Sequence, residues 1–145
     1  MDYYYSQTFS IYKNYGIGAP TMGQKGCVIT CLAMILSYFN DKAFYPEQML
    51  SWGRENGMLD NQGNTRFEVF CKATGNKLRI SVTNNAQPGE VIYAVREILL
   101  SNGQKHWIID HPTQPNMVID SYDGKVKPYR SFNYTGRAYY YIGKK

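Results

Sequence analysis

The hydrophobic pattern of the chain is dominated by an apolar run from Cys27 to Phe39, which follows a turn containing Gly23 and Gly26. The run is long enough for about three helical turns, so we predict a buried helix that begins at Cys27. Unpaired backbone N–H groups and the positive end of the helix dipole favour a thiolate in the first turn, and the thiolate is the nucleophilic form of cysteine. Cys27 is therefore a candidate nucleophile.

Two further helices are predicted after this one. The first begins at Pro46, which suits the first helical position, and ends by Gly57. The second begins at Thr65, whose spacing to Glu68 is that of a capping box, and ends at Gly75. We expect the apolar side chains of both helices to belong to the core.

The pattern then changes to strands. Residues 77–83 alternate between apolar and polar side chains, and residues 136–143 form a last strand. Residues 106–110 and 117–121 flank a loop with two prolines and predict a hairpin. Residues 91–95 are rich in strand formers but also fit one face of a helix, so both alternatives stay open. Helices followed by antiparallel strands predict an α+β fold, with N-terminal helices packed on a C-terminal antiparallel β-sheet.

The N-terminal region shows the sequence pattern of neither a signal peptide nor a membrane anchor. Residues 3–15 alternate aromatic and polar groups without a helical period, which indicates an extended arm or an edge strand. Residues 1–7 lack the basic and apolar parts of a signal peptide, and no apolar run reaches the length of a membrane span. We expect synthesis in the cytoplasm without a signal peptide, and leave open whether the protein acts there, on a virion or on a cell wall.

Composition is that of a globular protein. Of 145 residues, 43% are hydrophobic and 19% are charged, which predicts one domain over residues 1–145. Fourteen tyrosines indicate strands and an aromatic-lined surface or cleft. Sixteen Lys and Arg against eleven Asp and Glu give a formal net charge of +5. Because this excess is spread along the chain and accompanies no nucleic-acid-binding motif, we expect a basic surface and no nucleic-acid partner.

The three cysteines indicate free thiols. Their number is odd, and Cys27 and Cys31 lie four residues apart in the same apolar run. A disulfide framework would use an even and dispersed set, so we expect reduced thiols. With two histidines in the whole chain, both far from the cysteines in sequence, we expect no metal and no cofactor.

A cysteine nucleophile also needs an imidazole to take its proton and a polar group to orient that ring. His106, at the start of one predicted strand, and Asp120, at the end of the next, supply these groups. A hairpin register that pairs His106 with Asp120 would place the two side chains directly opposite each other, whereas a slip of one residue would put Asp120 on the other face. This register is left open.

Each of these groups has a rival. His111 is the alternative imidazole, but it precedes a proline at a loop entrance, where we expect poor support for its ring, and it falls on the other face of the strand from His106. Asp110 and Asp123 are alternative orienting acids, which we rank below Asp120.

Three stretches of the sequence carry a family resemblance. Tyr5-Ser6-Gln7, followed after a loop by Gly26-Cys27-Val28-Ile29-Thr30-Cys31-Leu32-Ala33-Met34, and His106-Trp107-Ile108-Ile109 with Asp120 and Gly124 after it, resemble the bacteriocin-processing-peptidase-like branch of the papain-like cysteine peptidase superfamily. Members of this branch, found in bacteria and phages, read Tyr-x-Gln, then Gly-Cys-Gly-x-Thr-Ser-Leu-Ala-Met, then His-Trp-Val-Val and Asp-Pro-x-x-Gly. The chain departs from this pattern at Val28, Cys31 and Ser121, which removes no catalytic group.

The resemblance implies a papain-like fold and a cysteine hydrolase that cleaves an amide bond in a peptide or a peptidoglycan stem peptide, through an acyl-enzyme. It implies Cys27 as nucleophile, His106 as general base and acid, and Asp120 as the group that orients His106. Gln7 would be the oxyanion-hole side chain, with Gln24 as the alternative. The partner would be a peptide or cell-wall peptide, and the oligomeric state is open. The alternative function is a catalytically silent papain-like binding or structural module, for example a phage virion component.

Overall fold

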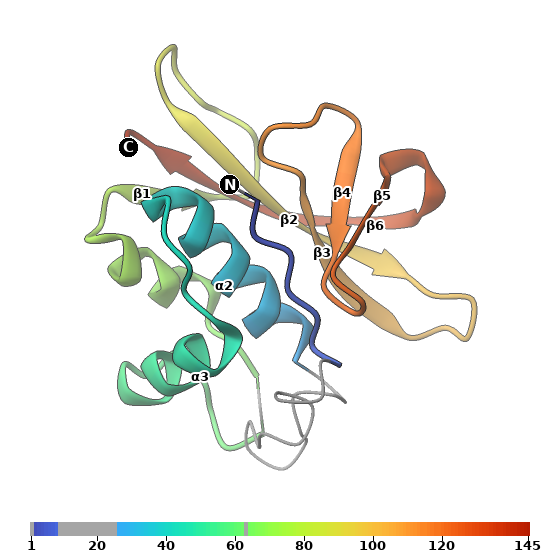
Figure 1. Ribbon diagram of the computed structural model, residues 1–145, viewed down its shortest axis with the longest axis horizontal. Helices are drawn as coiled ribbons and strands as arrows, with labels where there is room; N and C mark the ends of the chain where they lie inside the picture. The colour runs from blue at the N-terminus through green and yellow to red at the C-terminus, as the bar shows by residue number, and fades with distance from the viewer. Residues whose placement is uncertain (1, 9–25, 63) are drawn as a thin grey trace.

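Helices and strands follow one another along the chain in the predicted order. The computed structural model describes residues 2–8, 26–62 and 64–145. Its elements are the helices α2 (Cys27–Asn40) and α3 (Pro46–Glu55), the 3-10 helices η1 (Phe67–Thr74) and η2 (Tyr129–Ser131), and the strands β1 (Leu78–Ser81), β2 (Val91–Leu99), β3 (Lys105–Asp110), β4 (Met117–Asp120), β5 (Lys125–Pro128) and β6 (Asn133–Gly143). Within these residues the six strands form one antiparallel sheet in the order β1-β6-β2-β3-β4-β5 (Figure 1). The predicted α+β class is confirmed.

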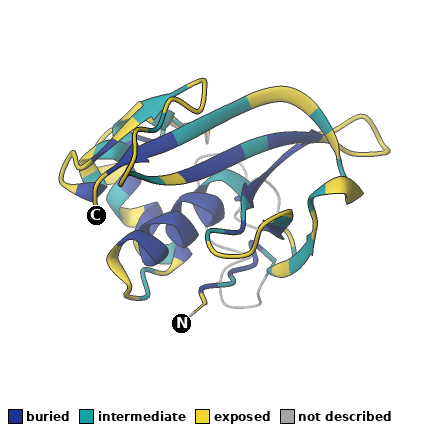
Figure 2. Ribbon diagram, turned by 90° about the horizontal axis from the view of Figure 1, so that it is seen from above, coloured by how far each residue is buried: buried dark blue, intermediate teal, exposed yellow. Residues whose placement is uncertain are grey.

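Helix α2 is the centre of the core. Every residue from Ile29 to Phe39 is buried, and the apolar side chains of α2 form one cluster with those of α3, β2, β3 and β6. Figure 2 shows the helices gathered on one face of the sheet. The helix ends where Asp41 adopts a left-handed conformation, so that its N–H reaches the carbonyls of Ser37 and Tyr38. The predicted start at Cys27 is confirmed.

Strand β2 explains why its sequence was ambiguous. It lies inside the sheet between β6 and β3, so both of its edges are paired. Val95 belongs to the main core under α2, whereas Ile98 packs with Ile108 and Val118 in a second small cluster on the opposite face. A strand that is apolar on both faces loses the simple alternation of a half-buried strand and can therefore match a helical period.

The predicted capping box at Thr65 is wrong. The helix that follows is a 3-10 helix that begins at Phe67 with Arg66 as its N-cap residue, and no side chain caps it. Thr65 is held in extended conformation by a β-bridge to Leu59, and the Arg66 N–H donates to the Met58 carbonyl at 2.8 Å. These tertiary contacts override the local capping signal. The predicted stop at Gly75, which adopts φ +65°, is confirmed.

Residues 2–8 form an arm that packs on α2. The Tyr5 N–H lies 3.4 Å from the Met34 sulfur, and the Tyr5 hydroxyl lies 3.1 Å from that of Ser37. Because these residues join no strand, the edge-strand alternative is wrong for them; residues 9–15 of the same prediction lie outside the described residues. No helix in the described part of the chain is both long enough and apolar enough to span a membrane.

Candidate active site

A cleft with a volume of about 620 Å³ collects side chains from distant parts of the sequence. Gln7, Cys27 and His106 line this cleft, which we call the Cys27 cleft. Asp120 lies behind His106 and is hydrogen-bonded to its ring. The structure therefore brings together the four side chains that the sequence analysis selected.

Cys27 is the first residue of α2. Gly26 is the N-cap residue, and its carbonyl accepts the Thr30 N–H at 2.9 Å, which closes the first helical turn. The thiol is half-buried and free. No acidic side chain occurs in this turn, so the positive end of the helix dipole acts on the sulfur without a neighbouring carboxylate to offset it.

His106 is buried, with 6% of the residue exposed. Burial alone would lower the pKa of the ring, but hydrogen bonds to Asp120 and to the Cys27 side chain, together with the charges of both groups, raise its pKa to about 9. The Asp120 Oδ1 lies 2.9 Å from Nε2. Because Nε2 faces the carboxylate, Nδ1 is the ring nitrogen left for the sulfur. The ring is thus held between an acid and a thiol.

The register of the β3–β4 hairpin differs from the one considered above. Ile109 pairs with Ile119 and Asp110 with Val118, so in this register Asp120 is not opposite His106 but opposite the position of Ile108. The difference is two residues, and side chains alternate with a period of two, so both groups stay on the same face of the sheet. They meet diagonally, which still allows a 2.9 Å contact.

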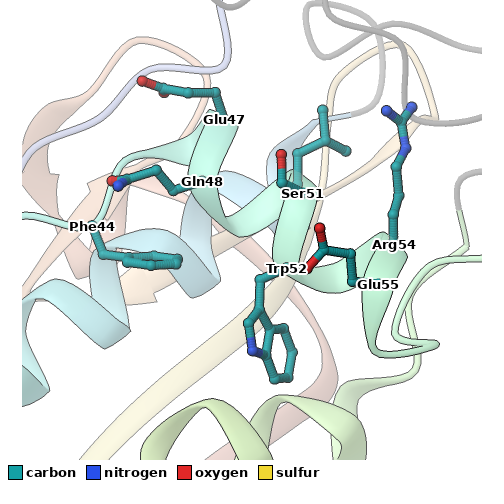
Figure 3. A pocket seen from close by; sticks show the side chains of 8 residues that line it. Phe44, Glu47, Gln48, Ser51, Trp52, Arg54 and Glu55 are labelled. Carbon is teal, nitrogen blue, oxygen red and sulfur yellow. The ribbon is translucent and has the colours of Figure 1, made fainter.

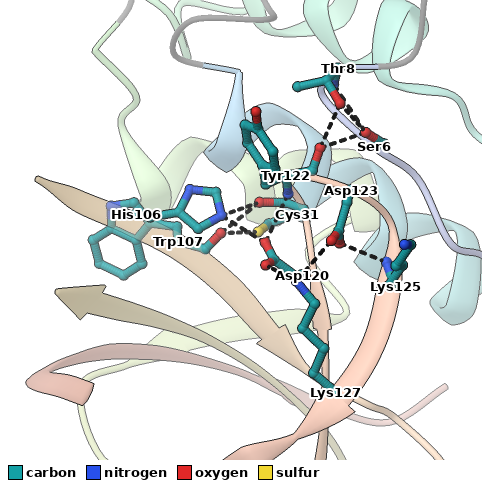
Figure 4. Close-up of polar contacts among 11 residues, drawn as sticks. Ser6, Thr8, Cys31, His106, Trp107, Asp120, Tyr122, Asp123, Lys125 and Lys127 are labelled. Atoms are coloured by element: carbon teal, nitrogen blue, oxygen red, sulfur yellow. Dashed lines mark hydrogen bonds and ion pairs between the residues drawn. The ribbon is translucent and has the colours of Figure 1, made fainter. Parts of the chain in front are cut away.

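Asp120 has a second cationic partner. Lys127 Nζ lies 2.7 Å from Oδ2, and the Tyr122 N–H donates to Oδ1 at 2.9 Å. Burial would raise the pKa of this carboxyl, but the hydrogen bonds from His106, Lys127 and the Tyr122 backbone hold it well below its usual range. Figure 4 shows the carboxylate between the imidazole and the lysine. Asp120 is therefore a fixed anion with both oxygens engaged.

The N-terminal arm places Gln7 in the Cys27 cleft. The Gln7 N–H donates to the Ser121 carbonyl at 2.8 Å, and the Ser6 hydroxyl donates to the Tyr122 carbonyl. Gly124 permits this close approach: it adopts φ +71°, and a Cβ atom there would lie 3.2 Å from the Tyr5 carbonyl carbon. The arm thus bridges the twenty residues that separate Gln7 from Cys27 in sequence. Gln24, the alternative, lies outside the described residues.

The rival histidine has a different environment. His111 is buried, and its Nδ1 accepts the N–H groups of Thr113 and Gln114, both at 3.1 Å. Its Nε2 therefore carries the proton and donates to the Tyr4 hydroxyl at 3.0 Å. Burial lowers the pKa of this ring. The expectation that His111 would be poorly supported is wrong, since backbone and side-chain contacts fix it as a neutral structural group.

The rival acids and the other cysteines also have partners. Asp110 forms a two-point ion pair with Arg96, and Asp123 pairs with Lys127 at 2.8 Å. The Cys31 thiol is fully buried and donates to the Trp107 carbonyl at 3.3 Å, and burial raises its pKa well above the usual value. Burial also raises the pKa of Cys71. Across the described ranges, no three His, Cys, Asp or Glu side chains group as a metal site would require.

Two charged residues near the site were missed in the sequence. Lys127 lies on β5, a strand that the hydrophobic pattern did not predict because its alternation covers only four residues. Arg137 lines the Cys27 cleft from β6. The sequence does contain a signal for this strand. Asp123-Gly124 is a residue pair that favours a hairpin turn, and Gly124 adopts a left-handed conformation between β4 and β5.

A second hollow lies on the outer side of α3. It has a volume of about 650 Å³ and is lined by Phe44, Glu47, Gln48, Leu50, Ser51, Trp52, Arg54 and Glu55. Figure 3 shows polar ends of these side chains around the helix, and neither histidine nor cysteine is among them. Although this hollow is slightly larger than the Cys27 cleft, it contains no nucleophile paired with a base.

Comparisons with known proteins agree with the fold. No family model and no curated protein sequence matches the chain. Among solved structures, the peptidase domain of Streptococcus ComA, a bi-functional ABC transporter involved in a quorum sensing pathway, is similar at a TM-score of 0.50 and 14% identity, over 84% of this chain and 93% of that one. This likeness concerns the fold. The chain therefore has an α+β fold similar to that of this peptidase domain.

Proposed function

We propose that the chain is a cysteine peptidase or amidase that cleaves an amide bond through a thioester intermediate. The observation that carries this proposal is that Cys27 and His106 line one cleft and interact there, while the His106 ring is hydrogen-bonded to Asp120. The likeness of the fold to a peptidase domain supports it. A half-buried thiol beside a ring of raised pKa is the arrangement expected of a thiolate–imidazolium pair.

In the proposed reaction, the Cys27 thiolate attacks the carbonyl carbon of the scissile amide. His106, protonated at Nδ1, then gives that proton to the leaving nitrogen as the C–N bond breaks and the thioester remains. A water molecule next loses a proton to His106 and attacks the thioester, which releases the acid and restores the thiolate–imidazolium pair. Asp120 holds the ring in place through Nε2 and stabilises its positive charge throughout.

The negative oxygen that forms in each step needs hydrogen-bond donors. We assign this role to the Gln7 side-chain amide and the Cys27 backbone N–H, because both belong to the Cys27 cleft and the N-terminal arm fixes the Gln7 backbone. Replacing such a donor costs about 10²- to 10³-fold in kcat. Gln7→Ala is expected to lower kcat by this amount while alkylation of the thiol persists.

Alkylation by iodoacetamide tests the central claim. A thiolate paired with an imidazolium reacts well below the free-cysteine pKa of about 8.5, so we expect labelling of Cys27 at pH 5.5. Cys27→Ala should abolish labelling at that pH, whereas Cys71→Ala, a matched change at another half-buried thiol, should retain it. Labelling that appears only near pH 8.5, or that is lost in Cys71→Ala, would contradict the proposal and favour a silent binding module.

The substrate class is tested by product analysis. A peptide and a peptidoglycan stem peptide both contain amides that fit the proposed chemistry. Incubation with casein and, separately, with purified muropeptides, followed by mass spectrometry, distinguishes them. We expect cleavage of at least one of the two by the unaltered protein and of neither by Cys27→Ala.

A further inference from the structure

A bulge in the sheet has no role in the proposed chemical steps. Opposite Glu97 on β2, the ladder with β6 shifts register, so that residues 135–137 of β6 face this one residue. Gly136 adopts φ +89° there, a conformation that favours glycine. Bulges beside active sites commonly change the direction of a side chain. Here the bulge brings Arg137 to the wall of the Cys27 cleft.

The surroundings of Arg137 hold its guanidinium in one place. The Cζ atom lies 5.4 Å from the centroid of the Trp107 ring and 5.7 Å from that of Tyr139. Nη2 donates to the Tyr139 hydroxyl at 3.1 Å, and Nη1 lies 3.6 Å from Glu97 Oε2. The Glu97 side chain is only 5% exposed, whereas that of Arg137 is 56% exposed. The buried acid therefore anchors the arginine from behind and leaves N–H donors free to face solvent.

The charge of the Cys27 cleft is one-sided. Among the described residues that line it, Lys105 and Arg137 are cationic besides His106, and none is acidic. Arg137 and Glu97 form a locally neutral pair, so Lys105, which has no acidic partner in the described part of the chain, supplies the net charge. Arg137 supplies directional N–H donors suited to a carboxylate.

A second hollow continues from the cleft beyond Arg137. It has a volume of about 420 Å³ and shares Thr65, Phe67 and Arg137 with the Cys27 cleft. Its remaining lining includes the apolar side chains of Ile80 and Val82, and Val82 is 73% exposed. The Phe67 and Tyr139 rings, stacked with centroids 4.4 Å apart, lie at the junction. An extended chain that leaves the cleft by this route passes Arg137 and then the apolar side chains of Ile80 and Val82, in a hollow that Arg66 and Glu68 also line.

We propose that the Cys27 cleft selects peptides with an acidic side chain, bound by Arg137 and Lys105, and with an apolar residue beyond it in the adjoining hollow. This inference rests on the proposed function, because it assigns a substrate class to the same site. Arg137 is a specificity residue in this scheme, and Glu97 is the residue that positions it.

Peptide binding to Cys27→Ala, which lacks the proposed nucleophile and should not cleave the peptide, tests the subsite separately from catalysis. Fluorescein-labelled hexapeptide mixtures, each with Glu, Gln or Lys fixed at one position, are titrated by anisotropy into Cys27→Ala. We expect the Glu mixture at the best position to bind about fivefold more tightly than the matched Gln mixture, the upper range for a partly exposed ion pair. The preference should weaken as the salt concentration rises.

Three variants in the Cys27→Ala background locate the preference. Arg137→Met, which keeps a long side chain but removes the charge, should lower the Glu-to-Gln ratio, and Lys105→Met should lower it as well. Arg130→Met changes an exposed arginine of η2 and should keep the full ratio. Equal binding of the Glu and Gln mixtures at every position, or a preference that survives both Arg137→Met and Lys105→Met, would overturn the inference. Because none of these readouts requires cleavage, a failed peptidase assay would count against the proposed function and not against the subsite.

Discussion

The two histidines of the chain lie five residues apart, His106 near the start of β3 and His111 directly after its end. They are equally buried, but their pKa values are shifted in opposite directions. His106 and His111 are each 6% exposed. The first faces a carboxylate and a thiol, and its pKa is raised to about 9. The second faces two backbone N–H groups and a tyrosine hydroxyl, and burial lowers its pKa. Burial therefore does not decide the charge of a histidine; the groups that its two nitrogens face do.

The largest expected difference between the two histidines is the loss of activity when each is replaced by glutamine. His106→Gln removes the proposed proton carrier and should lower kcat/KM by about 10²- to 10⁴-fold, the range of general acid–base catalysis. His111→Gln should keep activity but lower the free energy of unfolding by about 1–3 kcal/mol, because it disturbs buried hydrogen bonds. Peptide cleavage and urea unfolding of both variants measure this. Equal losses of activity in the two variants would contradict the assignment of His106 to the reaction and of His111 to the structure.

The pH dependence of stability should have opposite signs for the two rings. The folded pKa of His106 lies above its unfolded value, so its contribution is fully present below about pH 6.5 and is lost as the pH rises to about 9, up to about 3 kcal/mol. The folded pKa of His111 lies below its unfolded value, so stability falls as the pH drops below about 6.5.

Urea unfolding at a series of pH values measures both slopes. His106→Gln should flatten the loss of stability between pH 6.5 and 9, and His111→Gln should flatten the loss on the acid side. A His106→Gln variant with an unchanged alkaline slope would show that the ring is not held as an imidazolium.

Removing Lys127, which pairs with Asp120, should increase the difference in pKa between His106 and His111. Lys127→Met leaves the Asp120 charge less neutralised, so we expect the pKa of His106 to rise further and the alkaline limit of activity to move to higher pH. The loss in kcat/KM should be about fivefold or less, as for a partly exposed ion pair. Lys125→Met, an exposed neighbour on β5, is the matched control and should leave the pH profile in place. A downward shift in Lys127→Met would contradict this role.

The smallest expected effect concerns the support of His111. Tyr4→Phe removes the hydroxyl that accepts the proton on His111 Nε2 and should cost about 1 kcal/mol of unfolding free energy. Activity should not change, because Tyr4 does not line the Cys27 cleft. Thermal unfolding combined with a cleavage assay tests both statements, and a selective loss of activity would be evidence that His111 takes part in the reaction.

The sequence left open whether His106 and Asp120 lie on one face, because a register shift of one residue separates them whereas a shift of two does not. The observed register differs by two residues from a direct pairing, and the contact persists. The start of α2 at Cys27, in contrast, was predictable, since a long apolar run after glycine leaves little choice of helix boundary.

Other parts of the site depend on contacts between distant segments and were not predictable. The Thr65 signal favours an α-helix, but a bridge to Leu59 determines the local conformation. Nothing near His111 in sequence indicates that Tyr4 will contact its ring. The β2–β6 bulge that presents Arg137 arises from a mismatch between two strands, and no single-strand pattern encodes it.

The order of the strands in the sheet differs from the order in which they are synthesised. β6 lies between β1 and β2, although β1 and β2 leave the ribosome earlier. A nascent chain that has not yet produced β6 holds β1 without a neighbour and cannot cover the core under α2. The Cys27 cleft, which Arg137 of β6 lines, is therefore complete only after β6 has emerged and paired with its neighbours.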